Sequence, residues 1–152
     1  MMMKIHLLLF ILSVEFLSAK DIDTFKVITT TQDTLLLTEI ITNDRTTLMY
    51  FWATWCKSCG TETPKMIELS KEFPNIQFVP ISSATTINKV TNYLTKKDYM
   101  LNTYIDYSGS IFSKYSVSST PTIVIIDKEN NIRFNGYKSK RFYKKLLKKI
   151  LS

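Results

Sequence analysis

Both cysteines of the chain lie in one stretch, Phe51-Trp52-Ala53-Thr54-Trp55-Cys56-Lys57-Ser58-Cys59-Gly60. The apolar, aromatic-rich residues Leu48–Trp52 are typical of a short buried strand. After the second cysteine, the period of the apolar residues predicts a helix that ends near Phe73. Cys56 therefore falls at a strand-to-helix turn, where free backbone N–H groups and the positive end of the helix dipole stabilise a thiolate.

A Cys-x-x-Cys pair can be a structural disulfide, part of a metal site or a redox-active dithiol. A structural bridge is a weak explanation, because closing so small a ring removes little entropy from the unfolded chain. Structural zinc usually takes four Cys or His ligands. The one histidine, His6, lies near the N-terminus, so a zinc site or a copper-delivery site lacks ligands. Redox chemistry is favoured, with an inert disulfide as the alternative.

The composition indicates a globular protein. The 152 residues suit one domain with a sizeable core. The hydrophobic content of 45% and the mean hydropathy of -0.01 exclude a predominantly membrane-embedded or disordered chain. Few glycines and prolines, and no internal repeat, argue against a low-complexity protein.

The N-terminus resembles a targeting segment over residues 1–19. Lys4 supplies a positive start, Ile5–Val14 an apolar run, and Ser18-Ala19 a cleavage site. The run is short for a bilayer span, which needs roughly 20 residues. We expect a cleaved secretory signal, with an uncleaved N-terminal anchor as the alternative. Export to a periplasmic or other extracytoplasmic compartment would expose the cysteines to oxidising conditions and separate the chain from nucleic acid.

The net charge of +7 comes from the C-terminus. Residues 138–152 contain seven lysines and arginines and no acidic residue, so the rest of the chain is neutral. Residues 140–151 also have the apolar period of an amphipathic helix. Its lysines are expected to form a solvated face. A second interpretation is weak attraction to anionic lipid or to an acidic partner.

The other elements indicate an α/β domain. Residues 25–28 and 35–37 predict a hairpin, and residues 76–81 a strand parallel to 48–52, reached through the helix between them. A helix is expected over 86–97 and a strand after Pro121, which pairs back with residues 132–134. The predicted architecture is a central mixed sheet flanked by helices.

This order of elements resembles the thioredoxin fold, with Trp55-Cys56-Lys57-Ser58-Cys59 early and Ser119-Thr120-Pro121-Thr122 late. More narrowly, it is similar to the TlpA/ResA-like thiol–disulfide oxidoreductases, an exported or membrane-anchored branch. Glu62, Pro64 and Ile126-Asp127 also match that branch. The resemblance covers about residues 25–151, within a domain predicted over 20–152.

The resemblance implies roles for the residues of two loops. Cys56 would be the exposed nucleophile and Cys59 the buried resolving thiol. The Thr120–Pro121 bond would be cis, with Pro121 facing the cysteines and backbone groups of Thr120 binding substrate; the plainer alternative is a proline at a strand entry. Trp55 would contact substrate, or would pack beside the cysteine loop and shield it.

Glu62 is the candidate proton acceptor. Cytosolic thioredoxins usually carry a buried Asp six residues before the first cysteine, where this chain has Tyr50, which we expect to be a core residue. The alternative for Glu62 is a solvated helix position. Lys57 should favour the thiolate through its charge, and Lys57-Ser58 replaces the frequent x-Pro pair, so these two residues tune the redox potential.

The sequence thus predicts an exported thiol–disulfide oxidoreductase that acts on protein substrates. Its redox group would be the Cys56–Cys59 disulfide, with no other cofactor and no metal. The resemblance favours a reductant, for example of apocytochrome c or of misformed disulfides. A reductant outside the cytosol needs an electron donor, so we expect a membrane thiol-electron donor, and we expect the protein to be a monomer. The alternatives are a disulfide-forming oxidant and a non-catalytic thioredoxin-like binding module.

Overall fold

The sheet is built around β3 (Thr47–Trp52), all six residues of which are buried. Its side chains alternate between two cores: Tyr50 and Trp52 lie in one apolar cluster, and Met49 and Phe51 in the other. This alternation follows from the period of two along a strand, and it requires cover on both faces of the sheet. The computed structural model describes residues 25–152, so the predicted signal segment lies outside the described residues.

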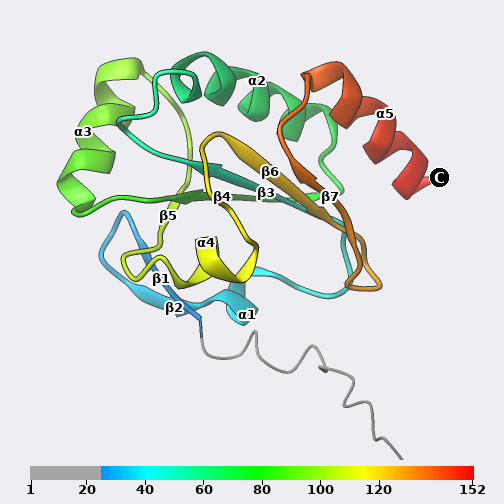
Figure 1. The fold of residues 1–152 in the computed structure, drawn as a ribbon, viewed down its shortest axis with the longest axis horizontal. Coiled ribbons are helices and arrows are strands. Elements are labelled where there is room, and N and C mark those ends of the chain that lie inside the picture. The colour runs from blue at the N-terminus through cyan, green and yellow to red at the C-terminus, as the bar shows by residue number, and fades with distance from the viewer. Residues whose placement is uncertain (1–24) are drawn as a thin grey trace, which may run out of the picture.

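Within these residues, seven strands form one sheet in the order β2-β1-β5-β4-β3-β6-β7 (Figure 1). β3 pairs in parallel with β4 and antiparallel with β6, which confirms the predicted mixed sheet. The crossover from β3 to β4 through a helix is also as predicted. The bounds of the other strands are β1 Lys26–Thr29, β2 Thr34–Leu36, β4 Gln77–Ser82, β5 Tyr104–Ile105, β6 Thr122–Ile126 and β7 Ile132–Gly136.

Helices cover both faces of the sheet (Figure 1). The longer helices α2 (Cys59–Glu72), α3 (Ile87–Lys97) and α5 (Lys140–Leu151) pack on the core that contains Trp52. The short helices α1 (Leu37–Ile40) and α4 (Ser110–Lys114) pack on the core that contains Phe51. No helix within residues 25–152 has both the length and the apolarity needed to cross a bilayer.

Pro64 lies inside α2 and removes one backbone hydrogen bond from its first turns. A proline has no N–H to donate to the carbonyl four residues earlier, which here belongs to Gly60. The hydroxyl of Tyr99 donates to that carbonyl at 2.5 Å. The tyrosine therefore replaces the missing bond, and α2 continues unbroken to Glu72.

Ion pairs join α5 to α2. Lys140 contacts Glu68 at 2.6 Å and Glu72 at 2.8 Å, and Lys144 contacts the other oxygen of Glu72 at 2.5 Å. The prediction of a wholly solvated basic face is therefore wrong for these two lysines, because their ammonium groups pair with acidic residues of α2 and hold α5 against it. Lys145, Lys148 and Lys149 remain exposed.

Asp127 organises the turn between β6 and β7. Its Oδ1 accepts from the backbone N–H groups of Glu129 and Asn131, and its Oδ2 from Arg133 at 3.1 Å. Burial alone would raise the pKa of Asp127, but the donors from Asn131 and Arg133 outweigh it and lower that pKa below its ordinary value.

Replacing Asp127→Ala should lower the free energy of unfolding by about 1–2 kcal/mol at pH 7, because the turn loses these bonds. A carboxylate with a lowered folded pKa stabilises the fold above its ordinary pKa of about 3.9 and stops doing so as the pH falls through the folded value. Urea unfolding at neutral pH and near pH 3 should therefore show the difference shrinking in acid. A constant difference would contradict this account.

Candidate active site

The two cysteines form a disulfide between the end of β3 and the start of α2. Their Cα atoms are 5.3 Å apart. Cys56 retains 5% of its exposure, whereas Cys59 is completely buried. The first cysteine is therefore the one that a partner molecule can reach.

The local backbone directs polar groups at Cys56. The N–H of Cys59 donates to the Cys56 sulfur at 3.2 Å and is also 3.1 Å from the Cys56 carbonyl oxygen. The hydroxyl of Ser58 lies 3.6 Å from the same sulfur. In the reduced protein, these donors and the start of α2 favour negative charge on Cys56. Lys57 and Ser58 are both exposed on the intervening turn.

The second loop of the site is brought to the cysteines by strand pairing. Phe51, near the end of β3, is opposite Thr122, the first residue of β6. Continuing this antiparallel register places Pro121 and Thr120 beside the chain that leads to Cys56. The Thr120–Pro121 bond is cis, as the resemblance implied. Pro121 is buried, and the Oγ1 of Thr120 is buried without a hydrogen-bond partner among the described residues.

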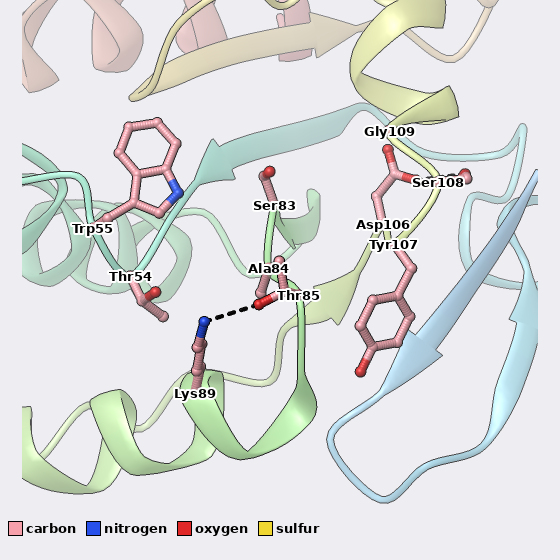
Figure 2. Close-up of a pocket in the computed structure, with 10 residues that line it drawn as sticks. All are labelled: Thr54, Trp55, Ser83, Ala84, Thr85, Lys89, Asp106, Tyr107, Ser108 and Gly109. Atoms are coloured by element: carbon pink, nitrogen blue, oxygen red, sulfur yellow. Dashed lines mark hydrogen bonds between the residues drawn. The ribbon is translucent and has the colours of Figure 1, made fainter.

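Trp55, which precedes Cys56 in the chain, lines two hollows. It is 74% exposed, so most of its ring is open to a partner molecule. A pocket of about 170 Å³ lies between Trp55 and the Ser118–Thr120 loop. A larger groove of about 590 Å³ is lined by Trp55, Lys89 and Tyr107, among other residues (Figure 2). Sequence reasoning did not find the groove, because its walls come from separate loops.

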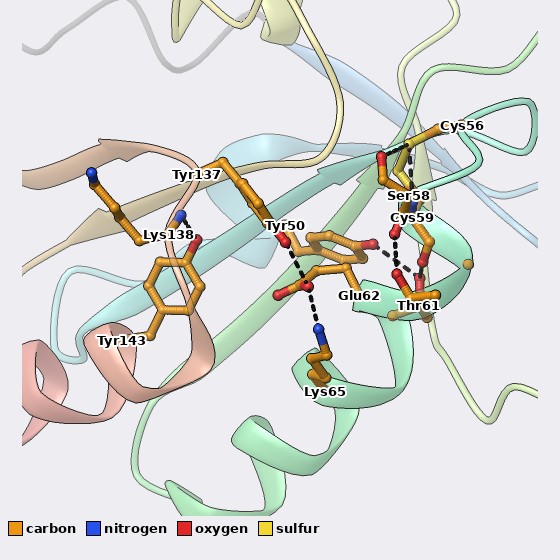
Figure 3. A network of polar contacts seen from close by, with 12 residues as sticks. Tyr50, Cys56, Ser58, Cys59, Thr61, Glu62, Lys65, Tyr137, Lys138 and Tyr143 are labelled. Atoms are coloured by element: carbon orange, nitrogen blue, oxygen red, sulfur yellow. Dashed lines mark hydrogen bonds and ion pairs between the residues drawn. A yellow bond between two sulfur atoms is a disulfide. The ribbon is translucent and has the colours of Figure 1, made fainter.

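Glu62 is not a solvated helix residue: its side chain is 1% exposed. It lies one turn after Cys59 on α2. Its Oε2 accepts from the ammonium group of Lys65 at 3.2 Å and from the hydroxyl of Tyr137 at 3.0 Å (Figure 3). We did not predict either partner. The spacing of three residues on a helix could have indicated Lys65, but Tyr137 follows 75 residues later and gave no local signal.

Tyr50 is a core residue as predicted, but its hydroxyl also has a partner. It forms a hydrogen bond of 2.9 Å with Thr63, whose own hydroxyl donates to the carbonyl of Cys59 at 2.8 Å. Burial raises the pKa of Tyr50, so the phenol stays neutral. The chain of bonds therefore ties β3 to the first turn of α2.

The side chains near the disulfide do not form a cluster with metal-binding composition. Across residues 25–152, no group of three or more His, Cys, Asp or Glu side chains is arranged to hold a metal ion. The groups that the site brings together are instead a disulfide, a buried carboxylate and hydrogen-bond donors. This set can exchange disulfides and transfer protons.

The family model for thioredoxin-like proteins matches residues 43–132, which span the cysteines and the cis proline. The chain belongs to the thioredoxin-like family. This membership agrees with the fold, since β3, α2 and β6 all lie within the matched stretch.

Two relatives give the sequence comparison. A thioredoxin-like protein of Haemophilus influenzae is 34% identical over 90 residues, which cover 59% of this chain and 53% of the relative. The thiol–disulfide oxidoreductase ResA of Bacillus thuringiensis is 32% identical over 104 residues, which cover 66% of this chain and 60% of that protein. The matched stretch thus spans a little more than half of each relative. The resemblance to ResA-like proteins is confirmed.

Two solved structures agree with the fold. The exposed lipoprotein thioredoxin of Streptococcus pneumoniae is 25% identical, with a TM-score of 0.69 that covers 82% of this chain and 98% of that one. A secreted disulfide oxidoreductase of Mycobacterium tuberculosis has a TM-score of 0.71 over 86% of this chain and 99% of its own, at 17% identity. The second likeness concerns the fold alone.

After reduction, Cys56 should react with iodoacetamide about tenfold or more faster than Cys59 at pH 7, because it is accessible and faces donors that favour its thiolate. Mass spectrometry of the digested protein after short exposures would give both rates. The same chain unfolded in urea is the control, in which the two rates should converge. Equal rates in the folded protein would contradict the assignment.

Proposed function

We propose that this protein is an exported thiol–disulfide oxidoreductase that reduces disulfides in protein substrates. The observation that carries the proposal is that strand pairing brings Cys56, the less buried cysteine of the disulfide, beside the cis Thr120–Pro121 bond. The preceding residue, Trp55, lines an open groove. The named oxidoreductases among the relatives support the same chemistry. The redox group is the cysteine pair itself.

The first step is attack by the Cys56 thiolate on one sulfur of the substrate disulfide. A bond forms between Cys56 and that sulfur, and the substrate disulfide breaks. The other substrate sulfur leaves with the electron pair and takes up a proton from water. The product is a mixed disulfide that joins the substrate to Cys56.

The second step releases the substrate. The thiol of Cys59 gives its proton to Glu62, and the resulting thiolate attacks the sulfur of Cys56. The Cys56–Cys59 disulfide forms, the bond to substrate breaks, and the substrate leaves as a reduced thiolate. The protein has lost two electrons and the substrate has gained them. Glu62 is suited to this role because it is buried on the same helix face as Cys59, three residues on.

Substrate would bind as an extended segment beside the cysteines. Backbone groups of Thr120 would form hydrogen bonds with this segment. The pairing of β6 with β3 begins only at Thr122, so the ladder of β3 and β6 does not include Thr120. Trp55 offers an exposed ring next to this position, and the groove continues toward Lys89 and Tyr107 (Figure 2). Main-chain pairing of this kind accepts many sequences, which suits a general protein reductant.

A reductant in an oxidising compartment needs electrons from elsewhere, so we further propose a membrane thiol-electron donor and a role such as keeping apocytochrome c cysteines or misformed disulfides reduced. The predicted N-terminal signal supports export. The alternative function is a disulfide-forming oxidant. A reduction potential near that of thioredoxin, about −270 mV, would favour the reductant, and one near −120 mV the oxidant.

The wild-type protein should reduce insulin with dithiothreitol as electron source, while Cys56→Ser should be inactive. In the absence of dithiothreitol, reduced Cys59→Ser should accumulate a mixed disulfide with substrate, because the variant has no second thiol to resolve it. Turbidity of the reduced insulin chains measures the first result, and non-reducing electrophoresis the second. Normal reduction by either cysteine variant would sink the proposal.

Weak membrane contact is a separate expectation for the exposed lysines of α5. Lys145, Lys148 and Lys149 would each contribute about 1 kcal/mol near an anionic surface. Sedimentation with vesicles rich in phosphatidylserine should fall when these three are changed to Gln. Changing Lys140 instead should disturb the contact between α5 and α2, which thermal unfolding would detect. Vesicle binding that is unaffected by the triple change would remove the idea.

A further inference from the structure

The carboxyl group of Glu62 is buried, yet both of its hydrogen-bond donors reach it from the surface. Its Oε2 accepts from Tyr137 at 3.0 Å and from Lys65 at 3.2 Å. Tyr137 is 52% exposed and the Lys65 side chain 49% exposed. The other oxygen, Oε1, is buried and has no hydrogen-bond partner among residues 25–152. One oxygen is thus held by donors and the other remains free to accept.

Two features set the position of Tyr137. The preceding residue, Gly136, has a φ of 148°, a conformation that residues with a side chain rarely adopt. The following residue, Lys138, donates its backbone N–H at 2.6 Å to the hydroxyl of Tyr143, a buried residue of α5 (Figure 3). The segment between β7 and α5 is therefore held on both sides of Tyr137, whose ring points toward Glu62.

The ionisable groups around Glu62 come from several elements. Tyr50 is on β3, Tyr143 on α5, Tyr137 after β7, and Cys59 and Lys65 on α2. Burial raises the pKa of Tyr50 and of Tyr143, and burial together with the bond to Glu62 raises that of Tyr137. All three phenols therefore keep their protons at neutral pH. Tyr137 can act as a donor throughout that range, and Lys65 supplies the positive charge in this set.

We propose that Tyr137, assisted by Lys65, is a positioning residue that holds Glu62 ready to accept the proton of Cys59 during substrate release. This inference rests on the proposed function. The two hydrogen bonds to Oε2 fix the rotation of the buried carboxyl group. Oε1 is the oxygen left without a partner among residues 25–152, so it is the one available to take a proton.

The test separates the two cysteine steps with a coloured aromatic disulfide, 5,5′-dithiobis(2-nitrobenzoate). Attack by reduced Cys56 releases the first coloured thiolate, and attack by Cys59 on the mixed disulfide releases the second. Stopped-flow absorbance therefore gives both rates at each pH. Tyr137→Phe removes only the hydroxyl, and Lys65→Met removes the ammonium group, which is both a charge and a hydrogen-bond donor.

In Tyr137→Phe, the second phase should be about tenfold slower near pH 6, where release depends on a protein base, and close to wild type near pH 9, where hydroxide can take the proton of Cys59. Lys65→Met should slow the second phase with the same dependence on pH. The first phase should be unchanged in both variants.

Matched controls exist on the same elements. Tyr104→Phe removes a hydroxyl on the opposite face of the sheet, and Lys71→Met removes an exposed lysine of α2. Both should keep the wild-type profile. In a Glu62→Gln background, Tyr137→Phe should have no further effect, since the hydroxyl acts through that carboxylate.

Three results would overturn the inference while the proposed function stands: slowing of the second phase to the same extent at every pH, slowing of the first phase as well, or an undiminished Tyr137→Phe effect in the Glu62→Gln background. Each would mean that Tyr137 acts by general packing. A wild-type protein that released neither thiolate would overturn the proposed function itself. Slowing of the second phase that is confined to low pH and disappears in the Glu62→Gln background would establish the positioning role.

Discussion

The antiparallel pairing of β3 with β6 is the constraint on which the site depends. Phe51 and Thr122 are opposite one another in the ladder, so the chain that leaves β3 toward Cys56 and the chain that enters β6 through Pro121 emerge at the same edge. Both strands are fully buried and belong to both cores. A shift of one residue would turn every side chain to the wrong face. The hydrophobic pattern of the sheet thus fixes the distance between the two active loops.

The second requirement is that the carbonyl groups of Cys59 and Gly60, in the first turn of α2, have hydrogen-bond partners. The carbonyl of Gly60, which Pro64 leaves without an N–H, accepts from Tyr99. The carbonyl of Cys59 accepts from Thr63, which in turn bonds Tyr50. An unpaired buried carbonyl would cost about 1–3 kcal/mol. The tyrosines around α2 are therefore as much a part of the dithiol site as the cysteines, because they hold its helix in place.

Sequence reasoning correctly predicted the strands and helices that follow from local sequence patterns. The strand before Cys56, the helix after Cys59 and the strand after Pro121 follow from periodicity and from a resemblance carried by adjacent residues. Sequence reasoning failed where the burial of a residue depends on segments that are distant in the sequence. Glu62 could not be distinguished from a solvated residue, because its partner Tyr137 lies far along the chain. Trp55 is a residue type that usually packs in a core, but here its side chain is exposed, because the loops beside it form hollows and do not cover it.

The basic C-terminal helix α5, first noted for its charge, also supports the residues of the site. Lys140 and Lys144 bind the acids of α2, so the helix that carries the positive charge is docked on the helix that carries Cys59 and Glu62. Tyr143 of the same element binds the backbone of Lys138, next to Tyr137. Loss of the α5 contacts would therefore loosen the donor that reaches Glu62. For this reason the C-terminal helix belongs to the structural support of the buried carboxylate, whatever its exposed lysines contact.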